Sequence, residues 1–134
     1  MIIDTSALVA ILQDEPERHA FTEAIESAET RRVSAATFVE CSIVIDARYG
    51  AEGLRALDRL IDIAGIETVP VDERQARAAR EAYFRFGKGR HQAGLNFGDC
   101  FAYALAVVLG EPLLFKGGDF ALTDVVPYLA PATP

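Results

Sequence analysis

The sequence predicts an α/β fold in which a central, mainly parallel sheet is covered by helices on both faces. Two observations lead to this prediction. Short apolar runs typical of buried strands alternate with longer segments whose apolar residues recur at helical spacing. With 134 residues, of which 51% are apolar, the chain can also enclose one substantial core. We therefore expect residues 1–134 to form a single domain.

The first half of the chain begins with a strand followed by a helix, because the apolar residues 1–3 end at an acid and helix formers follow. Pro16 suits the first turn of a second helix. Gly50 and Gly65 are expected to end later helices. The expected elements are a strand at 1–3, a helix up to residue 12, a helix from Pro16, a strand at 32–34, and helices over 35–48 and 52–64.

The second half continues the alternation of strand and helix. Asp72 is expected to cap the first helix of this half. The apolar residues expected on the buried face of that helix are Ala76, Ala79, Tyr83 and Phe86. The expected elements are a strand at 66–71, a helix over 72–86, a glycine-containing loop at 87–95, a helix over 97–109, a strand at 112–115 and a short helical turn after residue 119.

Composition excludes several classes of protein. The longest strongly apolar stretch, residues 101–109, is far shorter than the roughly 20 residues of a membrane helix. The N-terminus lacks the basic and then apolar pattern of a signal peptide, so we expect a cytoplasmic protein with no membrane partner. Cys41 and Cys100 lie far apart in predicted helices, which favours buried, reduced thiols over a disulfide or a cysteine-bound zinc ion.

The net charge of −7 argues at first against a nucleic-acid partner, because non-specific affinity for nucleic acids comes mainly from Lys and Arg. That objection depends on where the charges lie. Two divalent cations held by four of the carboxylates would bring the working charge to about −3. Net charge alone therefore does not decide the class of partner.

Four acidic residues are expected at one edge of the sheet. Asp4 and Asp119 follow predicted strands, whereas Asp99 and Glu40 lie in the first and second turns of predicted helices. Ligands of parallel α/β sheets bind beyond the carboxyl ends of the strands, where these side chains can converge. Because Mg²⁺ prefers carboxylate and water oxygens, the pattern indicates a divalent-metal site suited to phosphoryl chemistry.

Each of these acids also has a purely structural interpretation. Asp4 and Asp119 can cap helical turns. Asp99 stands three residues after Asn96, as in a capping box, and Glu40 can be an ordinary solvated helix residue. The spacing alone leaves both interpretations open.

Four local strings occur in order along essentially the whole chain. They are MIIDTSA at residues 1–7, SAAT at 34–37 leading to Glu40, NFGDC at 96–100, and GGDF at 117–120 followed by Thr123-Asp124. Their combination resembles the PIN-domain ribonucleases, and most closely the VapC-type toxins of bacterial toxin–antitoxin pairs.

This resemblance implies a three-layer α/β/α sandwich and an endoribonuclease that depends on Mg²⁺, with Mn²⁺ as a substitute, and that hydrolyses RNA with metal-activated water. It also implies a cognate antitoxin that occupies the active site, a homodimer, and a hetero-oligomer when antitoxin is bound. The residues that match the family's catalytic and metal-binding positions are Asp4, Glu40, Asp99 and Asp119. Of these, Asp4 and Asp99 match the most dependable ligands. Gly118 stands where many relatives have Asn, so Asp119 is the least secure match.

Further residues are expected to support such a site. Ser6 and Asn96 are candidates for orienting the metal-binding carboxylates, although each can also simply satisfy a helix N-terminus. Lys88, Arg90 and His91 are expected to contact the RNA backbone, because an acidic protein needs some cationic surface to hold RNA.

Two alternatives to a ribonuclease toxin remain open at this point. A haloacid-dehalogenase-type phosphatase also begins with a strand that ends in Asp, but it generally carries a second Asp two positions on, where this chain has Ser6. A catalytically silent PIN-like module that binds RNA or protein is the other alternative. The presence of all four acids argues against it.

Overall fold

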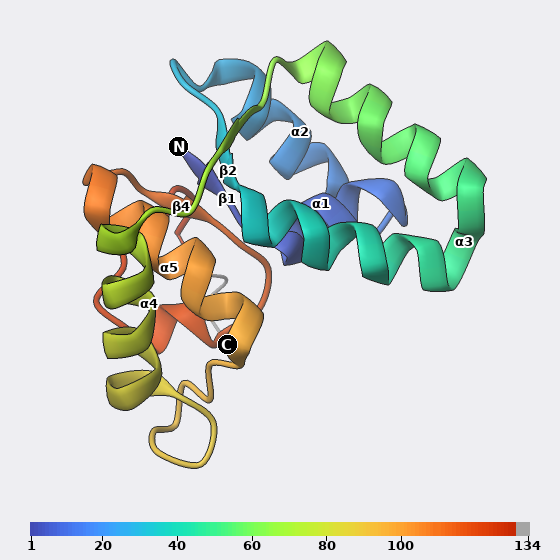
Figure 1. The fold of residues 1–134 in the computed structure, drawn as a ribbon. Helices are drawn as coiled ribbons and strands as arrows, with labels where there is room; N and C mark the ends of the chain where they lie inside the picture. Colours follow the sequence, from blue (N-terminus) through green and yellow to red (C-terminus); the bar gives the residue numbers. More distant parts are fainter. Residues whose placement is uncertain (131–134) are drawn as a thin grey trace.

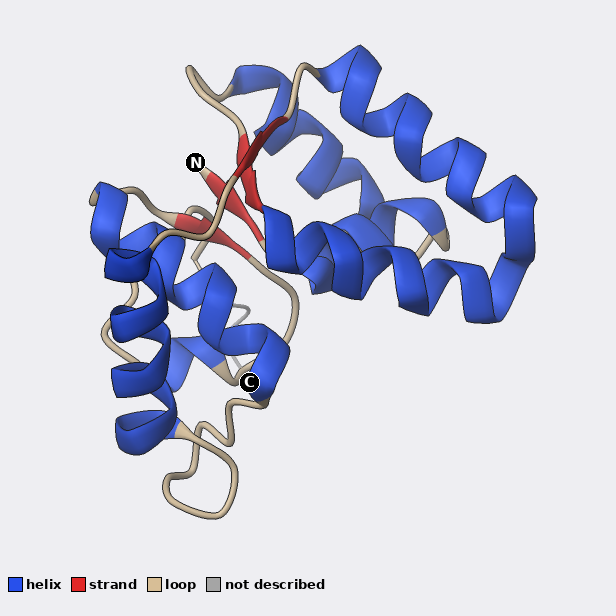
Figure 2. Ribbon diagram, in the orientation of Figure 1, coloured by secondary structure: helices blue, strands red, loops and turns tan. Residues whose placement is uncertain are grey.

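The computed structural model of this chain describes residues 1–130 and has a parallel sheet between two helical layers (Figures 1 and 2). The elements are β1 (Ile2–Ile3), α1 (Thr5–Leu12), α2 (Arg18–Ser27), β2 (Arg32–Ser34), α3 (Ala35–Ala64), β3 (Glu67–Val69), α4 (Glu73–Phe86), α5 (Phe97–Leu109), β4 (Leu113–Leu114) and the 3-10 turn η1 (Phe120–Leu122). Their order confirms the predicted alternation of strands and helices.

The four strands form one sheet in the order β3-β2-β1-β4, and every neighbouring pair is parallel. In this register Ile2 of β1 lies opposite Arg32 of β2 on one side and Leu113 of β4 on the other. Because all strands run in the same direction, their carboxyl ends meet at one edge of the sheet. The residues that follow β1, β2 and β4 are therefore brought together there.

The core lies on both faces of the sheet, which confirms the three-layer α/β/α arrangement. Ile3 and Val33 pack with α1, α2 and α3, whereas Ile2 and Leu113 pack with α4 and α5. The ribbon shows these helical groups on opposite sides of the strands (Figures 1 and 2). Successive strand residues point to opposite faces, so strands of only two or three residues can join both halves of the core.

Two boundaries differ from the sequence prediction. The helices expected over 35–48 and 52–64 are joined in α3, which changes direction at Gly50 with φ 63° and ψ −150°. A glycine adopts this backbone conformation without strain, so the chain bends there without a separate loop. The strand expected at 66–71 ends at Val69, because Pro70 has no N–H to donate to a neighbouring strand.

The buried face of α4 also differs from the prediction. Tyr83 was expected in the core but is 37% exposed, and Ala76 is exposed as well. Gln75 is buried instead, and its side-chain amide donates a hydrogen bond of 3.0 Å to the carbonyl of Pro70. The buried residues of α4 are Gln75, Ala79, Ala82 and Phe86. The buried face of α4 therefore includes a polar residue with a hydrogen-bond partner, which the purely apolar pattern does not reveal.

Both cysteines are free and buried, as predicted. Burial raises the pKa of the Cys41 thiol to about 12, so this thiol stays protonated in the core. Across residues 1–130, every helix is too short or too polar to cross a bilayer.

A polar cluster at the amino end of the sheet centres on Glu111. Its carboxylate accepts hydrogen bonds from the Met1 amine (2.7 Å), the Thr30 hydroxyl (2.8 Å) and the Arg32 guanidinium (2.6 Å). Partial burial alone would raise the pKa of Glu111, but these donors together lower it below its ordinary value. The charged form of Glu111 therefore stabilises the fold.

Replacing Glu111 with Gln should lower the free energy of unfolding by about 1–3 kcal/mol at pH 7, because bonds to a charged acceptor are lost. An acid whose pKa is depressed on folding stabilises the protein above its unfolded pKa, and this stabilisation disappears as the pH falls through the folded value. Urea unfolding should therefore show a large difference from the parent at pH 7, and this difference should shrink only as the pH falls below the ordinary Glu pKa of about 4.3 and through the lowered pKa of the folded state. The exposed Glu29→Gln variant is the control. Equal stabilities of Glu111→Gln and parent at pH 7 would contradict this assignment.

Candidate functional site

Asp4 lies directly after β1, and its carboxylate is buried at the carboxyl edge of the sheet. Its backbone N–H donates to the carbonyl of Leu114 (3.0 Å), which fixes the end of β1 against β4. Asp4 caps α1, because its Oδ2 accepts the N–H of Ser6 at 3.0 Å. The residue is only 2% exposed, and its Oδ1 is buried without a hydrogen-bond partner. The capping interpretation of Asp4 is confirmed, but it accounts for only one of the two carboxylate oxygens.

Glu40, in the second turn of α3, brings three helices together. Its Oε1 accepts a hydrogen bond of 2.5 Å from the hydroxyl of Thr5 in α1. Its other oxygen lies against Gly98 in the first turn of α5, where an added Cβ would come within 1.6 Å of Oε2. The Glu40 carboxylate therefore occupies space that only a glycine at position 98 leaves open.

Asp99 forms a reciprocal capping box with Asn96 at the start of α5. Its N–H donates to the side-chain oxygen of Asn96 (3.1 Å), and its Oδ2 accepts the N–H of Asn96 (3.0 Å). The structural interpretation of Asp99 is thus confirmed. Asn96 holds the first turn of α5, and with it the direction in which the Asp99 carboxylate points.

Asp119 is exposed and precedes η1, and its side chain makes no capping hydrogen bond. The capping interpretation considered for this residue is therefore wrong. Its loop is held from the other end, because the Ser6 hydroxyl accepts the N–H of Lys116 at 2.9 Å. The Lys116 amine also pairs with Glu15 and, at 3.2 Å, with Glu17. Ser6 thus links the segment after β1 to the segment after β4.

The charges of the four acids act on one another in two overlapping sets, Asp4 with Glu40 and Asp99, and Asp99 with Glu40 and Asp119. We call these four residues the acidic cluster (Asp4, Glu40, Asp99 and Asp119). Burial raises the pKa of Asp4 to about 7, with hydrogen bonds from Ser6 opposing the shift and the charges of Asp99 and Glu40 adding to it. Burial also raises the pKa of Asp99, as do the nearby charges of Glu40 and Asp119. Like charges are held together here although each disfavours ionisation of the others.

The acidic cluster fits a hard divalent cation, but it is not a closed cage. Among residues 1–130, no three His, Cys, Asp or Glu side chains stand close enough to enclose a metal ion as they are. Mg²⁺ does not need such an enclosure, since it keeps several waters and binds through one or two carboxylates. The orphaned Oδ1 of Asp4 is an available ligand, and all donors are carboxylate oxygens. These properties suit Mg²⁺ or Mn²⁺ rather than a metal that prefers sulfur ligands.

The basic residues of the loop after α4 lie on the surface. Lys88 bonds through its N–H to the carbonyl of Leu95 (2.9 Å) and leaves its amine exposed, and the Arg90 guanidinium lies 5.3 Å from the ring centre of Phe84. His91 accepts the N–H of Ala93 through Nδ1 at 3.0 Å. Within the described residues, no hydrogen bond or ion pair joins Lys88, Arg90 or His91 to the acidic cluster.

Two residues of the site were not predicted from the sequence. Thr5 supports Glu40, and Gly98 makes room for it. Gly98 gave a usable signal, because glycine in the first turn of a helix is less favourable than alanine and often marks a close approach. Thr5 gave none, since a threonine beside a helix start is common.

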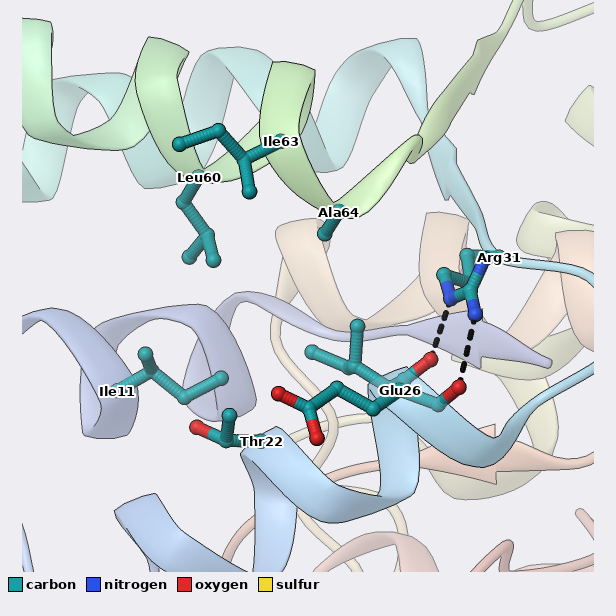
Figure 3. Close-up of a pocket in the computed structure, with 8 residues that line it drawn as sticks. Ile11, Thr22, Glu26, Arg31, Leu60, Ile63 and Ala64 are labelled. Carbon is teal, nitrogen blue, oxygen red and sulfur yellow. Dashed lines mark hydrogen bonds between the residues drawn. The ribbon is translucent and has the colours of Figure 1, made fainter.

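A second concave feature lies away from the acidic cluster. A groove of about 390 Å³ runs between α1, α2 and the second half of α3, with apolar walls that include Ile11, Leu60 and Ile63 (Figure 3). The Arg31 guanidinium closes one end by donating to the carbonyl of Glu26 at 3.0 Å (Figure 3). None of the four acids lines this groove, so it offers an apolar contact surface rather than a place for chemistry.

Comparisons with known proteins agree with this geometry. The PIN domain family matches residues 1–126. A protein named ribonuclease VapC from Mycolicibacterium smegmatis is 56% identical over 125 residues, which cover 93% of this chain and 97% of that protein. The crystal structure of VapC20 from Mycobacterium tuberculosis, a sarcin-ricin loop cleaving toxin, is similar with a TM-score of 0.75 at 16% identity, covering 93% of this chain and 95% of that one. VapBC2 from Rickettsia felis, bound to a DNA fragment from its promoter, has a TM-score of 0.72 at 13% identity, with 94% of each chain covered.

Replacing Gly98 with Ala should disturb the acidic cluster while leaving the fold intact. The new Cβ would displace the flexible carboxylate of Glu40, whereas alanine itself favours the helix. We expect the affinity for Mg²⁺ or Mn²⁺ to fall about 10-fold or more, as for loss of a contact that orients a ligand. The metal-induced rise in melting temperature, titrated against metal concentration, measures this.

Gly118→Ala is the matched control, because an added Cβ there meets nothing within 4 Å and the backbone is not left-handed. Its metal titration should match that of the parent. Equal titrations for Gly98→Ala and Gly118→Ala would mean that Glu40 has no part in metal binding.

Proposed function

The chain belongs to the PIN domain family as a VapC-type ribonuclease, and we propose that it is the endoribonuclease toxin of a toxin–antitoxin pair and that it depends on a divalent cation held by the acidic cluster. The metal is Mg²⁺, for which Mn²⁺ can substitute. The haloacid-dehalogenase alternative is wrong, because the family match covers residues 1–126.

One observation above all supports metal dependence, namely the buried Oδ1 of Asp4 that has no hydrogen-bond partner. A buried carboxylate oxygen is costly unless something satisfies it, and nearby acids raise that cost. A divalent cation offsets the charges of Asp4 and of the neighbouring acids at once. A purely structural helix cap needs only Asp4 Oδ2, which already accepts the N–H of Ser6.

The residues of the chain prepare the site for attack on a phosphodiester. Asp4 and Asp99 are the principal metal ligands, and Glu40 and Asp119 complete the negative set from α3 and from the loop after β4. Thr5 holds Glu40 in place, and Ser6 holds the loop that leads to Asp119. A bound Mg²⁺ would lower the pKa of a coordinated water, orient the scissile phosphate and offset charge on the leaving oxygen.

The first turn of α5 adds a second attraction for the substrate. The N–H groups at a helix start and the positive end of the helix dipole favour a phosphate. Asp99 lies in that turn, so the substrate phosphate and the metal ligands would meet at the same helix end. In the loop that precedes α5, Lys88 and Arg90 bind the RNA backbone, and His91 lies beside them.

Because its substrate is cellular RNA, we place the enzyme in the cytoplasm.

The antitoxin partner that we propose would contact the chain at two places. A basic side chain, most simply an Arg, neutralises the acidic cluster, because bidentate pairing suits carboxylates. An apolar segment of the same antitoxin lies in the groove bounded by Ile11, Leu60 and Ile63 (Figure 3), where Ile63 is largely exposed.

In the homodimer that we propose, the exposed Val39 and Ile43, one turn apart on α3, contact a second copy.

Changing Asp4 or Asp99 to Asn separates the structural from the functional role, because Asn caps a helix about as well as Asp. The metal-free variants should be as stable as the parent or more stable, since one of the mutually repelling charges is removed. RNA cleavage should fall at least about 100-fold, and metal-induced stabilisation should be lost. Melting curves with and without Mg²⁺, run beside a cleavage assay, measure both effects.

Asp72→Asn is the matched control, because Asp72 caps α4 by accepting the N–H of Gln75 at 2.8 Å and lies outside the acidic cluster. It should cleave RNA as the parent does. A parent without RNase activity in Mg²⁺ would leave the silent PIN-like module as the better description. An Asp99→Asn variant that keeps both metal stabilisation and cleavage would reduce Asp99 to a helix cap and sink this mechanism.

Replacing Lys88 and Arg90 together with Ala should weaken RNA binding about equally for different sequences and flatten its salt dependence. Each lost phosphate contact should reduce the slope of log K against log salt by about 0.7 on single-stranded RNA. The control is Arg55→Ala with Arg59→Ala, which removes the same charge from exposed positions on α3. Equal slopes for the two double variants would exclude a specific role of the loop.

A further inference from the structure

A small apolar pocket lies between α4 and α5, next to the acidic cluster but separate from it. It has a volume of about 210 Å³. Its walls include Ala79, Arg80 and Tyr83 of α4 and Phe97, Cys100 and Phe101 of α5. We call it the aromatic pocket. Resting on the proposed ribonuclease function, we propose that the aromatic pocket binds an unpaired nucleobase of the RNA substrate beside the cleaved bond.

Two aromatic side chains of the pocket, Phe97 and Tyr83, are too exposed to serve only as part of the hydrophobic core. Phe97 is 76% exposed at the first position of α5, and Tyr83 is 37% exposed although the sequence pattern places it on an apolar face. The Phe97 ring is supported by Phe101, with ring centres 4.9 Å apart in an edge-on arrangement. The supported Phe97 ring therefore presents an exposed aromatic surface to a planar ligand.

The charge around the pocket is opposite to that of the rest of the chain. Residues 73–91 contain six Lys or Arg and two acids, in a chain with a net charge of −7. Arg80 lines the pocket, and the Arg90 guanidinium lies 5.9 Å from the ring centre of Tyr83. Aromatic faces interleaved with cations are what single-stranded nucleic acids bind, with bases stacked and phosphates paired. Two copies of a basic face repel each other, so a second copy of this chain is the poorer occupant.

The position of the pocket relates it to cleavage. Phe97 and Asp99 are two positions apart in the first turn of α5, so their side chains leave the helix on different sides. Cys100, which lines the pocket, directly follows Asp99. Gly98, between Phe97 and Asp99, contacts Glu40 of the acidic cluster. Both the pocket and the acidic cluster lie at the start of α5, so one RNA strand that passes over this helix end can place a phosphate at the cluster and a base in the pocket. Duplex RNA, whose bases are stacked and paired, cannot place a base there.

The test measures binding of a fluorescent single-stranded 12-nucleotide RNA of mixed sequence by anisotropy in EDTA, so that no cleavage takes place. Phe97→Leu keeps an apolar side chain but removes the ring, and it should raise Kd about 10-fold, the loss expected from one stacked base. Phe97→Tyr keeps the ring and should bind as the parent does. Val107→Ala, at the exposed far end of α5, is the control. Affinity for a duplex of the same length should be equal in all variants.

Two outcomes would overturn the proposal. One is equal single-strand affinity of Phe97→Leu and parent. The other is a change of oligomeric state in Phe97→Leu, measured by light scattering, with no change in RNA affinity, which would assign the pocket to a protein interface. Because binding is measured without metal, a result that overturns the pocket proposal leaves the ribonuclease proposal standing. The ribonuclease proposal rests on a different measurement, cleavage of RNA by the parent in Mg²⁺.

Discussion

The buried carboxylate of Asp4 is the group on which the rest of the site depends. Its backbone N–H joins β1 to β4, one of its oxygens caps α1, and its other oxygen has no partner. Taking such a charge out of water costs several kcal/mol unless it is paired. The fold adds to that cost, since Glu40 and Asp99 raise the Asp4 pKa further. A proton or a cation must therefore accompany Asp4, and the surrounding acids favour a multivalent cation over a proton.

The acidic residues show that capping and metal binding are not alternatives. Asp4 and Asp99 each use one oxygen to satisfy a helix N-terminus, which fixes the side chain without using up its charge. Such a cap orients a carboxylate in the same way as a hydrogen-bonded supporting residue orients a metal ligand. Glu40 reaches the same edge from α3 only because Gly98 leaves room and Thr5 supplies a hydrogen bond. The site is thus assembled from helix starts, whose positions are fixed by the short parallel strands.

Much of this arrangement could be predicted from the sequence, because it follows from local patterns. Apolar runs and caps located the helices within a few residues, and the four family strings indicated the acids. What failed depended on side-chain hydrogen bonds, which apolar spacing does not reveal. The apolar spacing of α4 predicted a buried Tyr83, but α4 buries Gln75, which donates to the carbonyl of Pro70, and leaves Tyr83 37% exposed. The support of Glu40 by Thr5 joins residues 35 positions apart, which no periodicity can reveal.

Crystals of the protein grown with Mn²⁺, measured at the manganese absorption edge, test most directly whether Asp4 is the centre of a metal site. If it is, an anomalous peak will lie within direct coordinating distance of Asp4 Oδ1 and will be shared with at least one other member of the acidic cluster, leaving the Ser6 bond to Oδ2 intact. A map without a peak at the acidic cluster, in which Asp4 Oδ1 still has no partner, would contradict the central role of Asp4 in the site.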